Sequence, residues 1–162
     1  GTAGATGATG AAGAAGPKGD PGSSVGGLAA YGYIFNLGSK QTVEINQPIT
    51  FDNNGVLVGI RHEERSSEIN ILQSGTYMVT FSVSGTEPNQ FALFVNRDVV
   101  SGSIYGSGAG TQPNVGQVIV ELNKDDVLTL VNYSSDAAVG LQSLAGGRQE
   151  NVNASISILK LN

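Results

Sequence analysis

From Leu28 onward the chain alternates apolar and polar positions with a period of two. The clearest run is 75–84 (GTYMVTFSVS). Its apolar positions share one face: Tyr77, Val79, Phe81 and Val83. Its hydroxyl positions share the other: Thr76, Thr80, Ser82 and Ser84. This alternation is typical of an antiparallel strand with one buried face.

Similar short runs recur along the rest of the chain. The further predicted strands are 28–36, 41–45, 55–60, 68–73, 90–96, 98–105, 115–122, 126–133 and 152–161. Turn-forming residues separate them at Asn53-Asn54-Gly55, Ser74-Gly75, Asn96-Arg97-Asp98, 123–126 and 145–147. No window has a helical apolar stripe. About ten short strands at this spacing predict an all-β sandwich or jelly roll.

Residues 1–24 follow a different rule, because glycine occupies every third position (GTA GAT GAT GAA GAA GPK GDP GSS). Strict spacing of this kind is required where three polyproline-II chains meet at a collagen axis. The alternative is a flexible Gly/Ala linker, which has no need to keep the phase. In the collagen interpretation, Lys18 and Asp20 pair between staggered chains. The phase ends at Val25, which predicts a stalk at 1–24, a joint at 25–27 and a head at 28–162.

The stalk segment contains only two prolines, Pro17 and Pro21, so it cannot set the register of three chains by itself. A folded head that forms a homotrimer would hold the three stalk ends together at roughly millimolar effective concentration or above. The low charged fraction of 13% also favours a subunit that covers part of its surface with copies of itself. We therefore expect a homotrimer.

Net charge and cysteine content exclude several classes of partner and site. The net charge of −5 disfavours nucleic acid and anionic membranes as partners. The chain has no cysteine, so disulfides, zinc–thiolate sites and cysteine nucleophiles are excluded. It begins within a run of Gly triplets and not with Met, and we expect it to be a piece of a longer protein.

The residues that could carry chemistry are few. The single histidine, His62 in Arg-His-Glu-Glu-Arg, is predicted to lie in a solvated loop; a subunit contact and a metal ligand are the alternatives. Asp125-Asp126 fits a hairpin turn better than a calcium loop. The sequons at Asn132 and Asn153 lie in predicted strands. We predict no catalytic residue, no metal site and no cofactor, and the polar loop 101–114 is either a binding loop or merely tolerated.

One set of apolar residues is predicted to form the core or the seam between subunits, with a ligand site as the alternative for the aromatic ones. Its members are Tyr31, Tyr33, Phe35, Tyr77, Val79, Phe81, Phe91, Ile156 and Ile158.

These features resemble the C1q/TNF superfamily, and most of all the collagen-like spore-surface glycoproteins of the BclA type. The resemblance is carried by the triplets 1–24 and by the segments 29–35 (AAYGYIF), 71–81 (ILQSGTYMVTF) and 153–161 (NASISILKL). It implies a jelly-roll head that trimerises and registers the stalk. It also implies O-glycosylation of stalk threonines, for which Thr2, Thr6 and Thr9 are the candidates.

The resulting hypothesis is a non-enzymatic display protein on a bacterial spore surface (the exosporium), with adhesion to a host cell or matrix as a further role. It requires no membrane insertion. The alternative is a C1q-like or phage-fibre-type recognition module that binds a glycan or a protein. Calcium-dependent recognition, as in metazoan C1q heads, is not expected without an acidic calcium loop.

Overall fold

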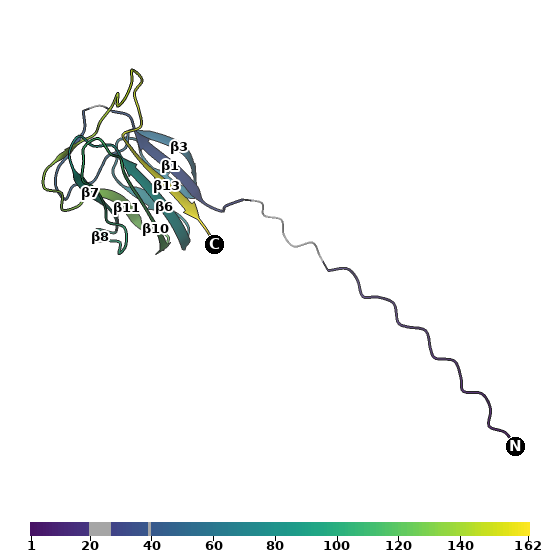
Figure 1. Cartoon of the computed structure of the whole chain (residues 1–162). Coiled ribbons are helices and arrows are strands. Elements are labelled where there is room, and N and C mark those ends of the chain that lie inside the picture. The colour runs from purple at the N-terminus through teal and green to yellow at the C-terminus, as the bar shows by residue number, and fades with distance from the viewer. Residues whose placement is uncertain (20–26, 39) are drawn as a thin grey trace.

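The chain folds into a sandwich of antiparallel sheets. A computed structural model describes residues 1–19, 27–38 and 40–162. Within these ranges the regular structure consists of strands and turns, without a helix, so the all-β prediction is confirmed. Figure 1 shows the strands gathered in one body and residues 1–19 as an extended segment apart from it.

The first sheet has five strands in the order β10-β6-β13-β1-β3. They are β1 (Tyr31–Asn36), β3 (Asn53–Val58), β6 (Gly75–Val83), β10 (Asn114–Leu122) and β13 (Ala154–Lys160). All neighbours are antiparallel. The longest ladders join β6 to β10 and to β13, so β6 lies in the middle of the best-paired part of the sheet.

The second sheet follows the order β4-β5-β11-β7-β8, with β9 also paired to β7. Its strands are β4 (Ile60–His62), β5 (Ile69–Ile71), β7 (Asn89–Val95), β8 (Asp98–Val99), β9 (Tyr105–Ser107) and β11 (Val127–Asn132). A separate small pair joins β2 (Thr42–Val43) to β12 (Val139–Gly140).

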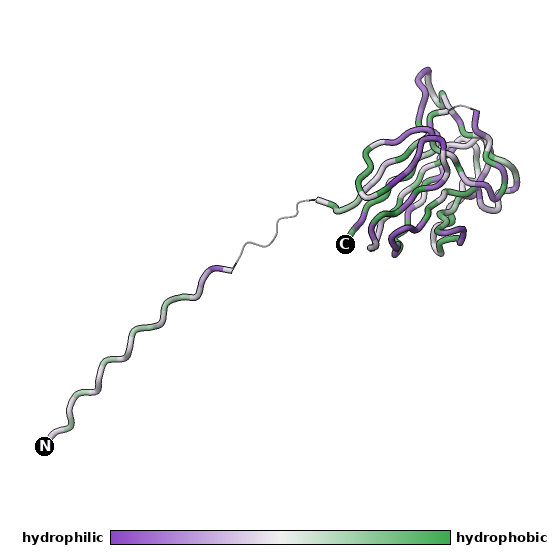
Figure 2. Tube along the Cα trace, turned by 180° about the vertical axis from the view of Figure 1, so that it is seen from behind, coloured by the Kyte–Doolittle hydropathy of each residue, from purple (hydrophilic) through white to green (hydrophobic). Residues whose placement is uncertain are grey.

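The core lies between the two sheets and is built from the inward-facing residues of each strand. In β6 the alternate residues Tyr77, Val79, Phe81 and Val83 are buried, as the period of two predicts. The facing side chains include Phe91, Leu93, Leu128 and Leu130. Each such side chain stabilises the fold by about 1.5–3 kcal/mol relative to an exposed one. Figure 2 shows the alternation of hydropathy along the strands.

Several predicted boundaries were wrong. The predicted strand 98–105 divides into β8 and β9, so part of the predicted loop 101–114 is a strand. The predicted turn at Asn53-Asn54-Gly55 is the first half of β3. The turn at Asn96-Arg97 is confirmed: both residues have positive φ (49° and 73°), the combination that fits a two-residue hairpin to twisted strands.

The prediction of a solvated loop at His62 was also wrong. His62 ends β4 and is only 5% exposed. Its Nδ1 lies 2.5 Å from the Oδ1 of Asn54, and its Nε2 lies 2.7 Å from the backbone oxygen of Ser66. Asn54 in turn donates a hydrogen bond from Nδ2 to the backbone oxygen of His62 at 2.8 Å. The ring can be buried because β3 and the returning turn at 63–66 satisfy its polar atoms.

At the end of β1, the carboxylate of Asp52 holds the turn that follows the strand. It accepts hydrogen bonds from the backbone N–H of Leu37 at 3.0 Å and of Gly38 at 2.9 Å. Partial burial raises the pKa of Asp52, but hydrogen bonds from Leu37, from the Asn53 side chain and from Gly38 outweigh it and lower the pKa below its ordinary value.

This lowered pKa predicts a loss of stability in acid. Because the folded pKa lies below the unfolded value of about 4, the contribution of Asp52 is complete above about pH 4 and is lost as pH falls through the folded value. In Asp52→Asn the melting temperature should therefore fall less between pH 7 and pH 3 than it does in the unmodified chain. Asp98→Asn, which changes an exposed carboxylate without a hydrogen-bond partner among the described residues, is the control. An equal fall in Asp52→Asn and the unmodified chain would contradict this assignment.

Candidate trimer interface

The outward face of the first sheet carries an apolar row that runs from edge to edge. Backbone pairing places Ile119 opposite Met78, Met78 opposite Leu159, and Leu159 opposite Tyr31. Val58 of β3 stands opposite Tyr31 and completes the row. Directly opposite side chains on one face lie within contact distance of one another, so the five residues form one continuous stripe.

The β10 end of this face is unusually exposed for apolar residues. Ile119 is 63% exposed and Val115 is 56% exposed. On the inward side of the same strand, Val118 and Val120 pack against the core. Gln117 and Glu121 alternate with the two exposed apolar residues, but large apolar side chains on both faces of a strand still indicate that both faces are covered. The single chain covers only one of them.

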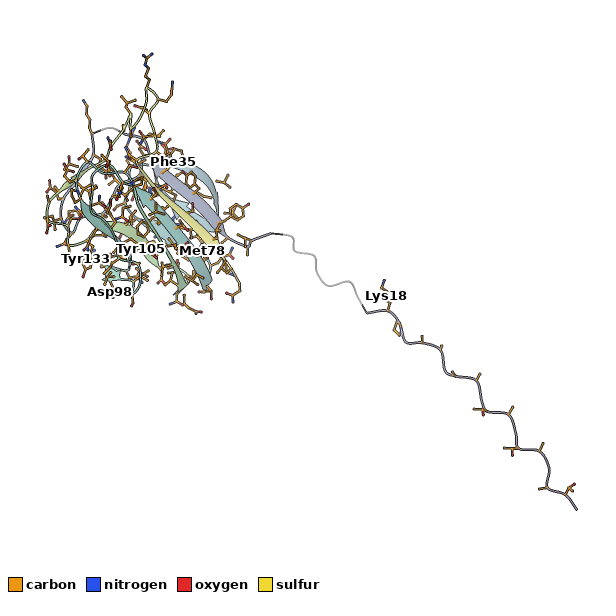
Figure 3. The ribbon with its side chains drawn as sticks, in the orientation of Figure 1. Lys18, Phe35, Met78, Asp98, Tyr105 and Tyr133 are labelled. Atoms are coloured by element: carbon orange, nitrogen blue, oxygen red, sulfur yellow. The ribbon has the colours of Figure 1, made fainter. Side chains whose placement is uncertain are left out.

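A hollow of about 380 Å³ lies beside the same strand, lined by Met78, Tyr105, Gln117, Val118 and Ile119. The hydroxyl of Tyr105 donates a hydrogen bond to the backbone oxygen of Gln117 at 2.9 Å, which fixes one wall. Figure 3 labels Met78 and Tyr105 near each other at this part of the sandwich. The hollow is large enough to accept a side chain from another subunit.

The predicted core-or-seam residues divide into two groups. Six of them are buried between the sheets: Tyr77, Val79, Phe81, Phe91, Ile156 and Ile158. The other three alternate along the outward side of β1: Tyr31, Tyr33 and Phe35. The rings of Tyr33 and Phe35 stack with centroids 5.2 Å apart. Sequence reasoning therefore included the β1 part of the outward face but missed Ile119, Met78, Leu159, Val115 and Val58.

The residues predicted to be modified or paired in the stalk lie in or next to the extended N-terminal segment. Thr2, Thr6 and Thr9 are exposed, as is Lys18, which Figure 3 shows on the extended N-terminal segment. Asp20 lies outside the described residues, and with it the predicted Lys18–Asp20 pair. The sequon residues Asn132 and Asn153 are 0% and 1% exposed, so the folded chain offers neither for glycosylation.

The acidic residues and the histidine of the described ranges form no metal site. In residues 1–19, 27–38 and 40–162, no group of three His, Asp or Glu side chains is placed to hold a metal ion. Asp126 is part of a hairpin connection: it accepts hydrogen bonds from the Asn123 backbone and the Asn96 side chain. No helix that could span a membrane is found in the part of the chain that the structure describes.

Comparison with known families agrees with this architecture. A family model described as the BclA C-terminal domain matches residues 32–162. The chain belongs to this family. The matched range spans every strand from β1 to β13 except the first residue of β1, so the BclA C-terminal domain and the sandwich are the same unit. No curated protein matches the sequence.

Solved structures with the same fold come from the C1q/TNF group. The globular domain of zebrafish complement 1qA protein is similar with a TM-score of 0.64 and 12% identity, covering 82% of this chain and 98% of that one. The Eiger TNF of S. frugiperda gives 0.59 and 12%, with 83% and 93% covered. Murine APRIL gives 0.52 and 9%, with 82% and 98% covered. At these identities the likeness shows the fold: the BclA C-terminal domain here is a C1q/TNF-like jelly roll.

Proposed function

We propose that residues 28–162 are the trimeric head of a collagen-like filament, and that the head registers the three stalk chains. The observation that carries this proposal is the exposed apolar row of Ile119, Met78, Leu159, Tyr31 and Val58. A continuous apolar patch on a protein surface marks a site of association with another protein, whereas apolar residues exposed singly are ordinary. The C1q/TNF-like fold supports the same interpretation, since such domains form homotrimers.

The position of the row supports its coupling to the stalk. Tyr31 begins β1, the first strand after the stalk and joint, and Leu159 lies near the end of the last strand, β13. The row therefore lies at the end of the sandwich where the chain enters it. Three heads joined along this row would hold the C-terminal ends of the three stalk segments close together. A collagen triple helix needs this proximity for its three chains to start in register.

The division of the chain into 1–24, 25–27 and 28–162 is part of this proposal, as is sugar attachment at Thr2, Thr6 and Thr9. The exposed glycine-rich segment 1–19 has no strand or helix, and an added Cβ at any of its glycines would meet nothing within 4 Å in the single chain. In a triple helix those same positions would face the crowded axis.

The setting we propose is the surface of a bacterial spore, where the filament is displayed and its head contacts host surfaces. Membership of the BclA C-terminal family supports this setting. BclA-type and C1q/TNF-like domains are structural and binding modules, which supports a role without catalysis. In this role the head acts through its assembly and through the surface that remains exposed.

Ile119→Glu is expected to weaken the trimer, because it places a carboxylate within the proposed apolar contact, at the most exposed residue of the row. We expect the trimer dissociation constant to rise at least about tenfold, the equivalent of about 1.4 kcal/mol. Analytical ultracentrifugation of residues 1–162 over a concentration series measures it.

Ile45→Glu is the matched control, since Ile45 is also an exposed isoleucine (41%) and lies in a turn whose next residue pairs with β11 of the second sheet. It should leave the trimer intact. Equal dissociation constants for the two variants would show that the apolar row is not the interface.

A further inference from the structure

The outward face of the second sheet carries a groove of about 680 Å³, a volume within the usual range for ligand sites. Its floor is apolar and comes from the middle strands, with Phe94 on β7 and Val127 and Val131 on β11. Thr129 stands directly opposite Phe94 on the same face. The groove and the apolar row lie on opposite outer faces of the sandwich, so assembly through the row leaves the groove open.

Two chain segments and one hairpin form the walls of the groove. On one side, residues 46–48 pair with β11 through a bridge between Pro48 and Val131. Ser67 and Glu68 continue this wall before β5. On the other side stands the Asn96-Arg97 turn between β7 and β8. The floor is held by paired strands and the walls by turns with defined backbone geometry.

The polar side chains around this floor have unused hydrogen-bonding groups. Within the described part of the chain, no hydrogen-bond partner is found for the side chains of Gln47, Ser67, Thr129, Glu68 and Arg97. Together they offer amide, hydroxyl, carboxylate and guanidinium groups around an aromatic ring. Phe94 is half-buried, and the edge contact of its ring with Tyr133, at 5.3 Å between centroids, holds it in place.

A second hollow of about 330 Å³ adjoins the first, because Glu68 lines both. Its other lining residues are Arg61, Glu63, Ser66 and Asn70. Asn70 stands opposite Val127 on one side and Arg61 on the other, so the two hollows follow one line across the sheet. Each hollow is lined by an arginine and at least one glutamate. Among the described residues, these arginines and glutamates form no salt bridge with one another.

We propose that this groove, the outer-sheet groove, binds a neutral oligosaccharide of at least two sugar units. An aromatic ring on an apolar floor fits the C–H face of a pyranose, and the surrounding amide, hydroxyl and charged groups match its hydroxyls. Two adjoining hollows fit a chain of sugars better than a single one. This role goes beyond trimer assembly, and three such grooves on one trimer would add avidity to weak single-site binding.

The same observations disfavour other ligand classes. Charges of both signs line each hollow, so a strongly anionic or cationic ligand would meet a like charge. A peptide that binds by adding a strand needs a free sheet edge. The floor strand β11 has none, because β5 and segment 46–49 pair with one edge and β7 with the other. A purely apolar ligand would leave the charged rim without partners.

The test is a glycan array of neutral oligosaccharides of two to four units, probed with the whole chain 1–162. Hits are then titrated with the unmodified chain and with a double variant, Glu68→Gln with Arg97→Gln. Glu64→Gln with Arg148→Gln is the control, because it makes the same changes at exposed residues outside both hollows. Thr129→Val gives a second, nearly isosteric change within the groove.

We expect at least one neutral oligosaccharide to bind, with affinity lowered about tenfold or more by the groove variants and unchanged in the control. Because the groove variants leave the first sheet untouched, their trimer mass should be unaffected, which separates this inference from the proposed assembly. Absence of binding to any neutral oligosaccharide at millimolar concentration would overturn the proposal. So would binding that the groove and control variants lower equally, or binding of charged glycans alone.

Discussion

Replacing Phe81 with alanine is expected to lower the free energy of unfolding by about 3–5 kcal/mol. Phe81 of β6 is only 1% exposed and faces the second sheet. Its ring meets that of Tyr105 edge-on, with centroids 5.9 Å apart. Removal of the ring loses this contact and leaves a cavity that the ladders on both sides of β6 prevent from closing.

Urea unfolding at one fixed protein concentration measures the effect, because the stability of an oligomer depends on concentration. Ser82→Ala, the next residue of the strand and on its outward face, is the control, with an expected change below about 1 kcal/mol. Equal changes for the two variants would contradict the assignment of faces in β6.

Replacing Gly116 with alanine is expected to cost about 1–3 kcal/mol, although alanine usually suits a strand better than glycine. Gly116 of β10 is directly opposite Phe81. A Cβ at this position would collide with the Phe81 ring and lie 2.6 Å from Cδ2 of Tyr105. Both rings are held by the core, so the added methyl group overpacks it.

The two substitutions should be coupled, which gives a sharper test than either alone. In the Phe81→Ala background most of the obstacle to a Cβ at position 116 is gone, and the methyl group would partly fill the cavity. The double variant should therefore be more stable than the sum of the two single changes predicts. A stabilising effect of Gly116→Ala alone, or strict additivity, would contradict the close approach.

Long alternating strands could be predicted from the sequence with their buried faces, whereas only some of the short ones could: the predicted strands 41–45 and 68–73 contain β2 and β5. β6, β10 and β13 each have seven or nine residues, and their alternation sets both the strand and its buried face. β4, β9 and β12 have two or three residues, too few for a period to show. His62 is the clearest case: four charged neighbours in sequence suggested solvent, but its burial depends on Asn54 and Ser66, which the fold brings to it.

Four of the five residues of the apolar row, all but Tyr31, were missed for a related reason. The members of the row come from five strands, and only the register between those strands places them side by side. One local signal was available: Val115, Val118, Ile119 and Val120 put apolar side chains on both faces of β10. The outer-sheet groove left no such signal, since its residues come from four separate segments and only the sheet joins them.

The solution mass of residues 28–162 alone, measured by light scattering after size exclusion, tests the central claim most directly. This fragment contains every strand from β1 to β13. The account predicts a mass three times that of the fragment, which would show that the head assembles without the stalk. A monomer would contradict it, because the apolar row would then not join the heads and the register of the stalk would have to come from the stalk itself.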